Sequence, residues 1–283
     1  MTVHHFTVDV EEHFQVTALE QAVMRTQWDS HPSRVAESTR RLTDLMARHG
    51  TRGTFFVLGW VAERQPGLVR DLAAAGHEIA SHGWDHRRVV AQTPEHFRDS
   101  VRRSKALLED LTGREVAGFR APSFSIVPGV EWALDVLLEE GHRYDSSLFP
   151  IRRRGYGYPS ARRDPHPLER PSGTLLSVPP ATLRIGSRNL PAGGGGYFRL
   201  LPYALTQAAF TQAEQRGAPA TFYIHPWEID ADQPRLPVPL LTRIRHYGGL
   251  EHTAERLERL LGSYHFQPIA ETLGLLKPVC AAP

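Results

Sequence analysis

Short apolar runs alternate with segments of helical character along most of this 283-residue chain, and the alternation limits the fold more than any other feature. Strands that alternate with helices favour an α/β fold with a mainly parallel sheet. About seven such units in one domain suit a barrel better than a short open sheet, although periodicity alone does not separate the two. The predicted strands are residues 6–10, 54–58, 77–81, 116–120, 142–146, 175–178, 220–224 and a short one near 266. The predicted helices are residues 34–49, 66–75, 94–111, 130–140, 202–216 and 251–261.

Polar residues recur where the predicted strands end. They are Asp9, Glu11, His82, Arg120, Asp145 and His225. In a β/α barrel and in an open α/β sheet alike, the carboxyl ends of parallel strands lie on one side, and binding and catalysis concentrate there. We therefore expect these side chains to surround one site.

Two histidines, His82 and His86, follow one of the predicted strands at a spacing of four residues. On one helical turn such a pair shares a face, and two neutral imidazoles can hold one divalent metal ion. The spacing alone is common by chance. Its position after a strand, with the small Gly83 between the two, favours the metal interpretation.

Two acids at the end of the first predicted strand are candidates for work beside the histidines. Strand alternation puts Asp9 and Glu11 on one side and Val10 on the other. One acid can bind a metal while the other accepts a proton, or both can simply begin a solvated acidic loop. Glu12 is a weaker candidate, because continued strand geometry turns it away.

Three further strand ends carry residues with both a structural and a functional interpretation. Arg120 can keep an active-site carboxylate ionised or form a structural ion pair, and backbone N–H groups after Pro122 can face an oxyanion. Asp145 can orient a histidine or cap a turn. His225 can be a core residue or a general acid, and Trp227 can stack on a sugar ring or pack in the interior.

Composition excludes several classes of partner. Because 33 basic residues nearly balance 31 acidic ones, the net charge of +2 argues against nucleic acid or an anionic membrane as partner. No apolar run approaches the ~18 residues of a membrane span, and the first residues lack the features of a signal peptide, so we expect a cytoplasmic protein. Cys280 is the only cysteine, which excludes a disulfide within the chain and suggests an inert tail residue.

In combination and in this order, the motifs resemble those of the polysaccharide deacetylase superfamily, also called the NodB-homology or carbohydrate esterase 4 superfamily. The motifs that carry the resemblance are Thr7-Val8-Asp9, Ser81-His82 through His86, Arg120-Ala121-Pro122, Tyr144-Asp145-Ser146 and Ile224-His225-Pro226. The residues within these motifs are most similar to those of a subgroup found with bacterial exopolysaccharide and exosortase loci.

The resemblance implies an N-deacetylase built on a distorted (β/α)7 barrel, which acts on an N-acetylated amino-sugar glycan. It implies a barrel at residues 1–230 and a family-specific extension at 231–283 packed on it. It also implies a divalent metal, usually Zn²⁺, held by one acid and two histidines. The implied ligands are Glu11, His82 and His86, and the implied catalytic residues are Asp9 as base, His225 as acid, Arg120 to hold Asp9 and Asp145 to tune His225. The implied substrate contacts are Ser123, beside an oxyanion, together with Tyr197 and Trp227.

The chain departs from the family pattern at one position. The common pattern has two adjacent aspartates, of which the second binds the metal, whereas Val10 stands here. Glu11 is the natural substitute because it shares a face with Asp9. Two alternatives stay open: a metal-independent amidohydrolase that opens cyclic imide or ureide rings, in which Glu11, His82 and His86 would not converge, and a glycan-binding pseudoenzyme that has lost a catalytic residue.

Two predicted loops bear on the choice of glycan. The loop at residues 151–171 contains six arginines, which can meet an acidic or phosphorylated glycan or simply be solvated. The run Gly193–Gly196 before Tyr197 can be a mobile flap or only a turn.

Overall fold

The computed structural model describes residues 2–153 and 155–275, so Cys280 and Arg154 lie outside the described residues. The main sheet of the described residues follows the order β10-β1-β2-β3-β4-β5-β7-β6, with β11 added beside β1. All of its neighbouring strands are parallel except β6 and β7. The strands are β1 Val3–Val10, β2 Thr54–Val57, β3 Glu78–Ser81, β4 Gly118–Phe119, β5 Tyr144–Asp145, β6 His166–Arg170, β7 Gly173–Ser177, β10 Thr221–Ile224 and β11 His265–Gln267. A separate hairpin pairs β8 Thr182–Ile185 with β9 Arg188–Pro191.

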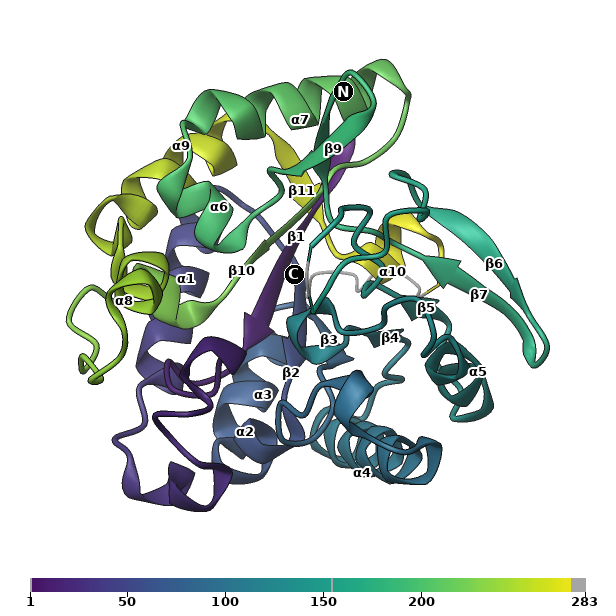
Figure 1. The fold of residues 1–283 in the computed structure, drawn as a ribbon, viewed down its shortest axis with the longest axis horizontal. Coiled ribbons are helices and arrows are strands. Elements are labelled where there is room, and N and C mark those ends of the chain that lie inside the picture. The colour runs from purple at the N-terminus through teal and green to yellow at the C-terminus, as the bar shows by residue number, and fades with distance from the viewer. Residues whose placement is uncertain (1, 154, 276–283) are drawn as a thin grey trace.

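The helices lie mainly on the outside of the curved sheet, whereas α10 (Ile269–Thr272) packs with Phe56, Ala80 and Tyr144 on its other face (Figure 1). They are α1 Val35–Arg48, α2 Gly59–Arg64, α3 Pro66–Ala74, α4 Pro94–Thr112, α5 Trp132–Glu139, α6 Gly195–Leu200, α7 Tyr203–Gln215, α8 Leu240–Tyr247, α9 Thr253–Ser263 and α10 Ile269–Thr272. Short 3₁₀ helices lie at Thr17–Leu19, Arg25–Ser30, Val89–Ala91, Pro122–Phe124, Pro226–Ile229 and Leu250–His252. Among the described helices, none has the length and apolar character needed to cross a membrane.

The long helix α4 shows why the sequence predicted most helices correctly. The Thr93 hydroxyl accepts a hydrogen bond from the His96 N–H, which satisfies one unpaired donor of the first turn. Pro94 occupies the first turn, where no N–H is needed. Gly113 ends the helix at φ 64°, a left-handed conformation that glycine adopts without strain.

The interior is organised around β1, which is buried along nearly its whole length. Phe6 and Val8 pack with Phe55 of β2 and Phe222 of β10 in the largest apolar cluster, which α1, α3 and α9 cover. A strand buried on both faces reads as a near-continuous apolar run, and this is the pattern from which the α/β fold was predicted. The parallel α/β architecture is therefore confirmed.

Segments outside the strands connect the two ends of the sheet. After β7, the Val178 N–H donates to the Asp145 carbonyl, and three residues later the Ala181 N–H donates to the Thr221 carbonyl of β10. Gly194 forms a further bridge with Tyr223 of β10. The sheet is therefore curved so that the chain after β7 reaches back to its other end.

The region between residues 151 and 197 differs from the sequence-based prediction. Residues 166–170 were predicted as loop, but they form β6, which pairs in antiparallel register with β7. The strand was not predicted because Pro167 is a typical loop signal. Proline is nevertheless tolerated in a strand at the edge of a sheet. The hairpin β8–β9 was also missed, and Gly195 begins α6 rather than continuing a loop.

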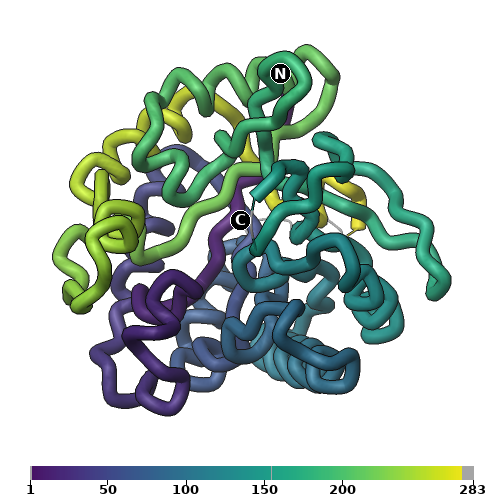
Figure 2. Tube along the Cα trace, viewed as in Figure 1, coloured from purple at the N-terminus to yellow at the C-terminus, as the bar shows by residue number. Residues whose placement is uncertain are grey.

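The segment after residue 230 adds to the same sheet and the same core. Val3 of β1 pairs with His265 of β11, so a segment near the C-terminal end of the described chain lies beside the first strand (Figure 2). Leu257 and Leu260 of α9 belong to the apolar cluster that contains Phe6. A domain boundary at residue 230 stays a prediction.

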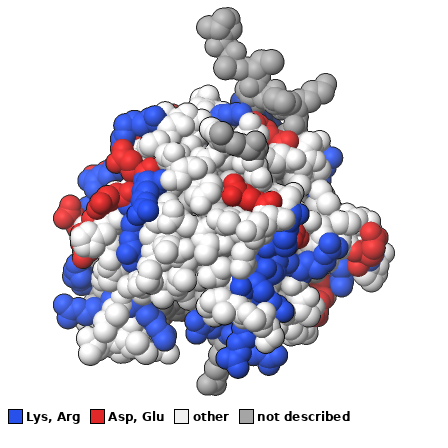
Figure 3. Space-filling view, turned by 90° about the horizontal axis from the view of Figure 1, so that it is seen from above, with Lys and Arg blue, Asp and Glu red and all other residues white. Residues whose placement is uncertain are grey.

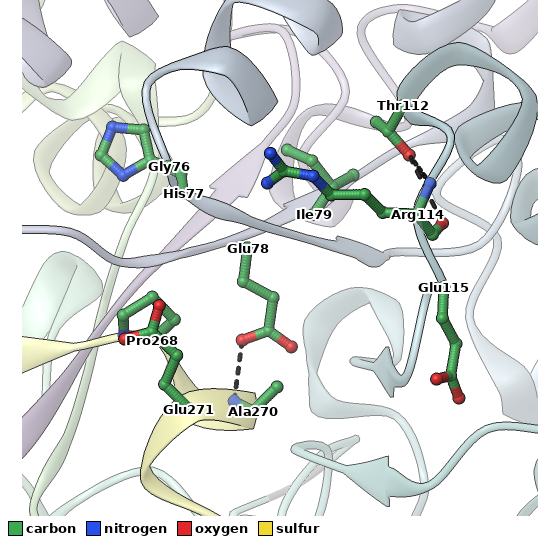
Figure 4. Close-up of a pocket in the computed structure, with 10 residues that line it drawn as sticks. All are labelled: Gly76, His77, Glu78, Ile79, Thr112, Arg114, Glu115, Pro268, Ala270 and Glu271. Carbon is green, nitrogen blue, oxygen red and sulfur yellow. Dashed lines mark hydrogen bonds between the residues drawn. The ribbon is translucent and has the colours of Figure 1, made fainter. Parts of the chain in front are cut away.

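A cavity of about 320 Å³ lies at the start of β3, at the amino ends of the strands (Figure 4). Its wall includes the buried Glu78, whose carboxylate accepts hydrogen bonds from the Tyr144 hydroxyl at 2.8 Å, the Thr54 hydroxyl at 2.6 Å and the Ala270 N–H at 3.0 Å. With its lone pairs engaged, Glu78 is a structural link between β3, β5 and α10.

Candidate active site

The strand-end residues lie around a cavity of about 420 Å³ at the opposite end of the sheet from Glu78. Parallel pairing of β10, β1, β2 and β3 brings the segments after these strands together, although they lie far apart in the sequence. The predicted site residues that line the cavity are Asp9, Glu11, His86, Ser123, Tyr197, His225 and Trp227.

Glu11, His82 and His86 form a cluster with the geometry of a metal site. Each residue offers one ligand atom, and these atoms lie within 4.8 Å of one another. Oε2 of Glu11 is 2.8 Å from Nε2 of His86. Nδ1 of His82 lies 2.7 Å from the Arg120 carbonyl, which can only accept, so Nδ1 carries the proton and Nε2 keeps its lone pair for a metal.

The two histidines do not reach the cluster along a helical turn, as the spacing had suggested. The segment after β3 is irregular, and Gly83 (φ 76°) and His86 (φ 53°) both adopt left-handed conformations. A non-glycine residue in this region costs free energy and typically marks a functional or tightly constrained site. The left-handed turn at His86 is what returns its ring toward His82, with 5.5 Å between ring centroids.

The electrostatics of Glu11 suit a ligand that stays ionised. Burial alone would raise the pKa of the Glu11 carboxyl, but the charges of His86 and His225 outweigh it and lower this pKa to about 2. Oε1 of Glu11 also accepts a hydrogen bond from Nε1 of Trp227 at 3.2 Å. Oε2 forms no hydrogen bond of regular geometry among the described residues and lies 2.8 Å from Nε2 of His86, which fits two atoms that share a cation.

Asp9 is held by Arg120, the pairing expected from the sequence. Oδ1 of Asp9 accepts from the Arg120 guanidinium at 2.7 Å, and the same nitrogen donates to the Thr7 hydroxyl at 2.8 Å. The rest of the guanidinium donates to Ser146, and the whole side chain is fully buried. A buried arginine of this kind fixes the orientation of the carboxylate.

His225 faces both acids across the cavity. Its Nε2 is 3.8 Å from Oδ2 of Asp9 and 3.7 Å from Oε1 of Glu11, while its Nδ1 is 2.6 Å from Oε1 of Glu228. Burial lowers the pKa of His225, but the charges of Glu11, Glu228 and Asp9 and the hydrogen bond that His225 donates to Glu228 outweigh burial and raise this pKa to about 9. His225 therefore carries a proton at neutral pH in this arrangement.

The expected link between Asp145 and His225 is wrong. The Asp145 carboxylate accepts from the Ser147 N–H at 2.9 Å and from the Ser147 hydroxyl at 2.5 Å, which is the turn-capping alternative. Glu228 is the acid that bonds His225, and its other oxygen accepts from Nε of Arg199 at 2.5 Å. Sequence reasoning missed Glu228 and Arg199; the available signal was a glutamate three residues after His225 in a segment opened by a proline.

The three expected substrate contacts have different surroundings. Ser123 lines the cavity at φ 55°, and its hydroxyl is 2.7 Å from that of Thr17. The hydroxyl of Tyr197, on α6, hydrogen-bonds that of Tyr156. Trp227 is only 6% exposed and stacks on His225 at 5.1 Å and on His246 at 4.3 Å between ring centroids. It also lines the cavity, and its contact with a sugar stays a prediction.

Comparison with known proteins agrees with this geometry. The profile described as "Polysaccharide deacetylase" matches residues 18–134, which contain His82, His86 and Arg120. The profile described as "Domain of unknown function (DUF3473)" matches residues 146–274, which contain His225 and Glu228.

Named relatives are similar over part of the chain. A peptidoglycan-N-acetylglucosamine deacetylase of Listeria monocytogenes is 28% identical over 117 residues, which are 38% of this chain and 25% of that protein. A peptidoglycan deacetylase of Helicobacter pylori is 32% identical over 110 residues, which are 38% of this chain and 36% of that protein. The chain thus spans about a third or less of the length of these relatives.

A solved structure shares the fold over nearly the whole chain. A Mycobacterium smegmatis protein assigned to the polysaccharide deacetylases superposes with a TM-score of 0.65 at 19% identity, covering 99% of this chain and 94% of that one. At this identity the likeness shows the fold alone. By the matching profile, residues 18–134 of this chain are similar to the polysaccharide deacetylase family, and the named relatives are deacetylases that match 38% of the chain.

Proposed function

We propose that the protein is a metal-dependent hydrolase that removes N-acetyl groups from amino sugars of a polysaccharide or of its precursor. The observation that carries this proposal is the convergence of the ligand cluster with two opposed groups for proton transfer. Glu11, His82 and His86 lie beside Asp9 on one side of the cavity, and His225 faces them. Amide hydrolysis needs a group that activates water, a base that accepts its proton and an acid that protonates the leaving amine, all in one site.

The donor set fits a divalent cation. Two imidazole nitrogens and one carboxylate oxygen are the ligands typical of a catalytic Zn²⁺ site, with one position left for water or substrate. Glu11 would take the place of the adjacent aspartate in the common family pattern, since its Oε2 already lies near His86. When bound, such a cation polarises the substrate carbonyl and lowers the pKa of water to ~7.

The protein's own groups would then move the protons. Asp9 would accept a proton from the attacking water, and its ion pair with Arg120 would hold it in position to do so. The new C–O bond forms as the amide C–N bond breaks, and acetate leaves. The amine nitrogen must gain a proton to depart, and His225, held protonated by Glu228, is placed to supply it. The Ser123 N–H is our candidate donor to the oxyanion, because the Phe124 N–H already donates to the Ala121 carbonyl.

The two alternative functions make different structural demands. A ring-opening amidohydrolase without a metal was expected to have Glu11, His82 and His86 dispersed, whereas their ligand atoms lie within 4.8 Å of one another. A glycan-binding pseudoenzyme would lack a catalytic group, whereas Asp9 and His225 both line the cavity. Both observations favour the metal-dependent enzyme. The cytoplasmic compartment and the link to exopolysaccharide synthesis stay predictions.

The test combines elemental analysis of the purified protein with acetate release from N-acetylglucosamine oligomers. We expect about one divalent metal ion per chain, activity lost on chelation, and activity restored by Zn²⁺. Asp9→Asn should abolish acetate release while keeping the metal, because Asp9 is placed as base and not as ligand. Near-full activity of Asp9→Asn would refute the assignment of the base, and activity that survives full metal removal would refute the metal-dependent mechanism.

A further inference from the structure

A second cavity, of about 750 Å³, lies between the segment around residues 150–159 and the hairpin β8–β9. Its lining contains four arginines, Arg152, Arg153, Arg184 and Arg188, and no acidic residue. The remaining lining residues are neutral and consist of proline, leucine, isoleucine, asparagine and serine. We call these four residues and the space between them the arginine cavity.

The arginine cavity adjoins the active-site cavity. The Arg153 guanidinium lies 5.7 Å from the centre of the Tyr197 ring, and Arg153 forms a backbone bridge with Tyr156. Both tyrosines line the active-site cavity, and their hydroxyl groups are hydrogen-bonded to each other. A glycan chain that places one sugar at the metal cluster can therefore extend past this tyrosine pair toward the arginines.

The rim of the active-site cavity is also cationic. Arg88 and Arg245 line it, and the Arg245 side chain is exposed. By contrast, Asp9 and Glu11 lie at the buried base of the cavity and face partners of their own. Negative charge is thus confined to the reacting centre, and positive charge surrounds the route that a longer ligand would follow.

Four guanidinium groups without a counter-ion repel one another. An anion bound between them removes the unfavourable electrostatic free energy of this repulsion. Other arginines near this region are paired within the chain, as Arg170 is with Asp135 and Arg216 with Asp164. Among the described residues, no carboxylate lies within 4.0 Å of the arginine cavity's guanidinium nitrogens. Figure 3 shows Lys and Arg side chains gathered toward the lower right of one face, with few acidic side chains among them.

We propose that the arginine cavity binds an acidic substituent, a carboxylate or a phosphate, on a sugar near the one that is deacetylated, so that the substrate is an anionic glycan. The planar fork of arginine matches both of these groups and binds them in a bidentate manner. This inference rests on the proposed function, because it assigns the substrate class of the same site. It uses residues that take no part in the chemistry.

The test compares two substrates of equal length: a neutral oligomer of N-acetylglucosamine, and an oligomer in which N-acetylglucosamine alternates with glucuronate. The double variant Arg152→Gln/Arg188→Gln removes two exposed charges from the arginine cavity. We expect kcat/KM for the acidic oligomer to fall about tenfold and that for the neutral one to stay unchanged. The matched control is Arg40→Gln on α1, an exposed arginine outside both cavities, which should change neither value.

Binding provides a readout that does not need turnover. In the Asp9→Asn background, calorimetric affinity for the acidic oligomer should exceed that for the neutral one, and the double variant and added salt should each reduce the difference. A phosphorylated N-acetylglucosamine oligomer, titrated in parallel, distinguishes a phosphate from a carboxylate site.

Three outcomes would overturn the inference: equal affinity for the neutral and acidic oligomers, a preference unaffected by the double variant, or equally tight binding of a sugar-free polyphosphate. Failure of the proposed function would look different. In that case wild-type protein with Zn²⁺ would release acetate from neither oligomer, while the binding comparison would still report on the arginine cavity.

Discussion

Oε1 of Glu228 lies 2.6 Å from Nδ1 of His225, and Oε2 of the same carboxylate accepts from Arg199 at 2.5 Å. Both carboxylate oxygens are therefore engaged, and Glu228 is fully buried. The pair holds the imidazole in one orientation with Nε2 toward Asp9 and Glu11. The acid that positions His225 thus comes from the next turn of its own segment, whereas the motif had suggested a different strand.

The first prediction concerns the pH dependence of Glu228→Gln. The negative charge of Glu228 raises the pKa of His225, so its removal lowers that pKa, and the proton needed by the leaving amine is lost at a lower pH. We expect a lower kcat and an alkaline limb of the pH–kcat profile that moves toward neutral pH.

Asp145→Asn is the matched control, because Asp145 bonds Ser147 and not His225. It should leave the alkaline limb in place. An alkaline limb that moves in Asp145→Asn and not in Glu228→Gln would show that the motif-based role of Asp145 is correct after all.

The second prediction tests which acidic residue and which histidines bind the metal. Glu11→Gln should weaken Zn²⁺ binding at least about tenfold, since a neutral amide replaces a carboxylate ligand, and His82→Ala should lose the metal. Competition with a chromophoric chelator measures both affinities. His96→Ala, on the surface of α4, serves as control and should bind Zn²⁺ like the wild type. Unchanged affinity in Glu11→Gln would point to another third ligand.

The third prediction tests whether the glycine run is packed or mobile. Gly194 has φ 140°, and a Cβ atom there would lie 1.8 Å from the Tyr223 carbonyl oxygen. Gly173 has a similar φ of 132° with open space around it. Gly194→Ala should therefore lower the free energy of unfolding by roughly 2 kcal/mol more than Gly173→Ala, measured by urea denaturation. Equal losses in the free energy of unfolding would mean that residues 193–196 change conformation easily, as a mobile flap would.

The fourth prediction concerns stability in acid. His142 is buried, and desolvation, followed by the charge of Lys105, lowers its pKa to about 3. Above pH 6.5 the folded and unfolded chains both hold it neutral. As the pH falls from 6.5 toward 3, the unfolded chain takes up a proton that the folded chain does not, so stability is lost.

His142→Leu should remove the part of the acid-dependent loss of stability that comes from this histidine. Between pH 7 and pH 5 the variant should lose about 2 kcal/mol less stability than the wild type, measured by urea denaturation at each pH. His252→Gln, at an exposed position, should follow the wild-type curve. A variant curve parallel to that of the wild type would show that His142 is protonated in the folded state.

Local chemistry was enough to predict most elements and the side of the sheet on which the site lies. Helix α4 begins at Thr93-Pro94 and ends before Gly113 because caps act over three or four residues. The alternation of strand side chains placed Asp9 and Glu11 on one face, and both line the cavity. Edge strand β6 was missed because its proline and its three polar residues, His166, Glu169 and Arg170, carry little apolar signal.

Contacts between distant segments were decided only by the tertiary structure. Glu11 meets Trp227, 216 positions away, and Asp9 meets Arg120, 111 positions away, because parallel strands of the sheet end side by side. The sequence by itself determined which residue types stand at the strand ends. It did not determine that Glu228 rather than Asp145 would reach His225, that Trp227 would be enclosed between histidines, or that four arginines would line one cavity. Those outcomes depend on loop conformations such as the left-handed turn at His86, which no local pattern of side chains encodes.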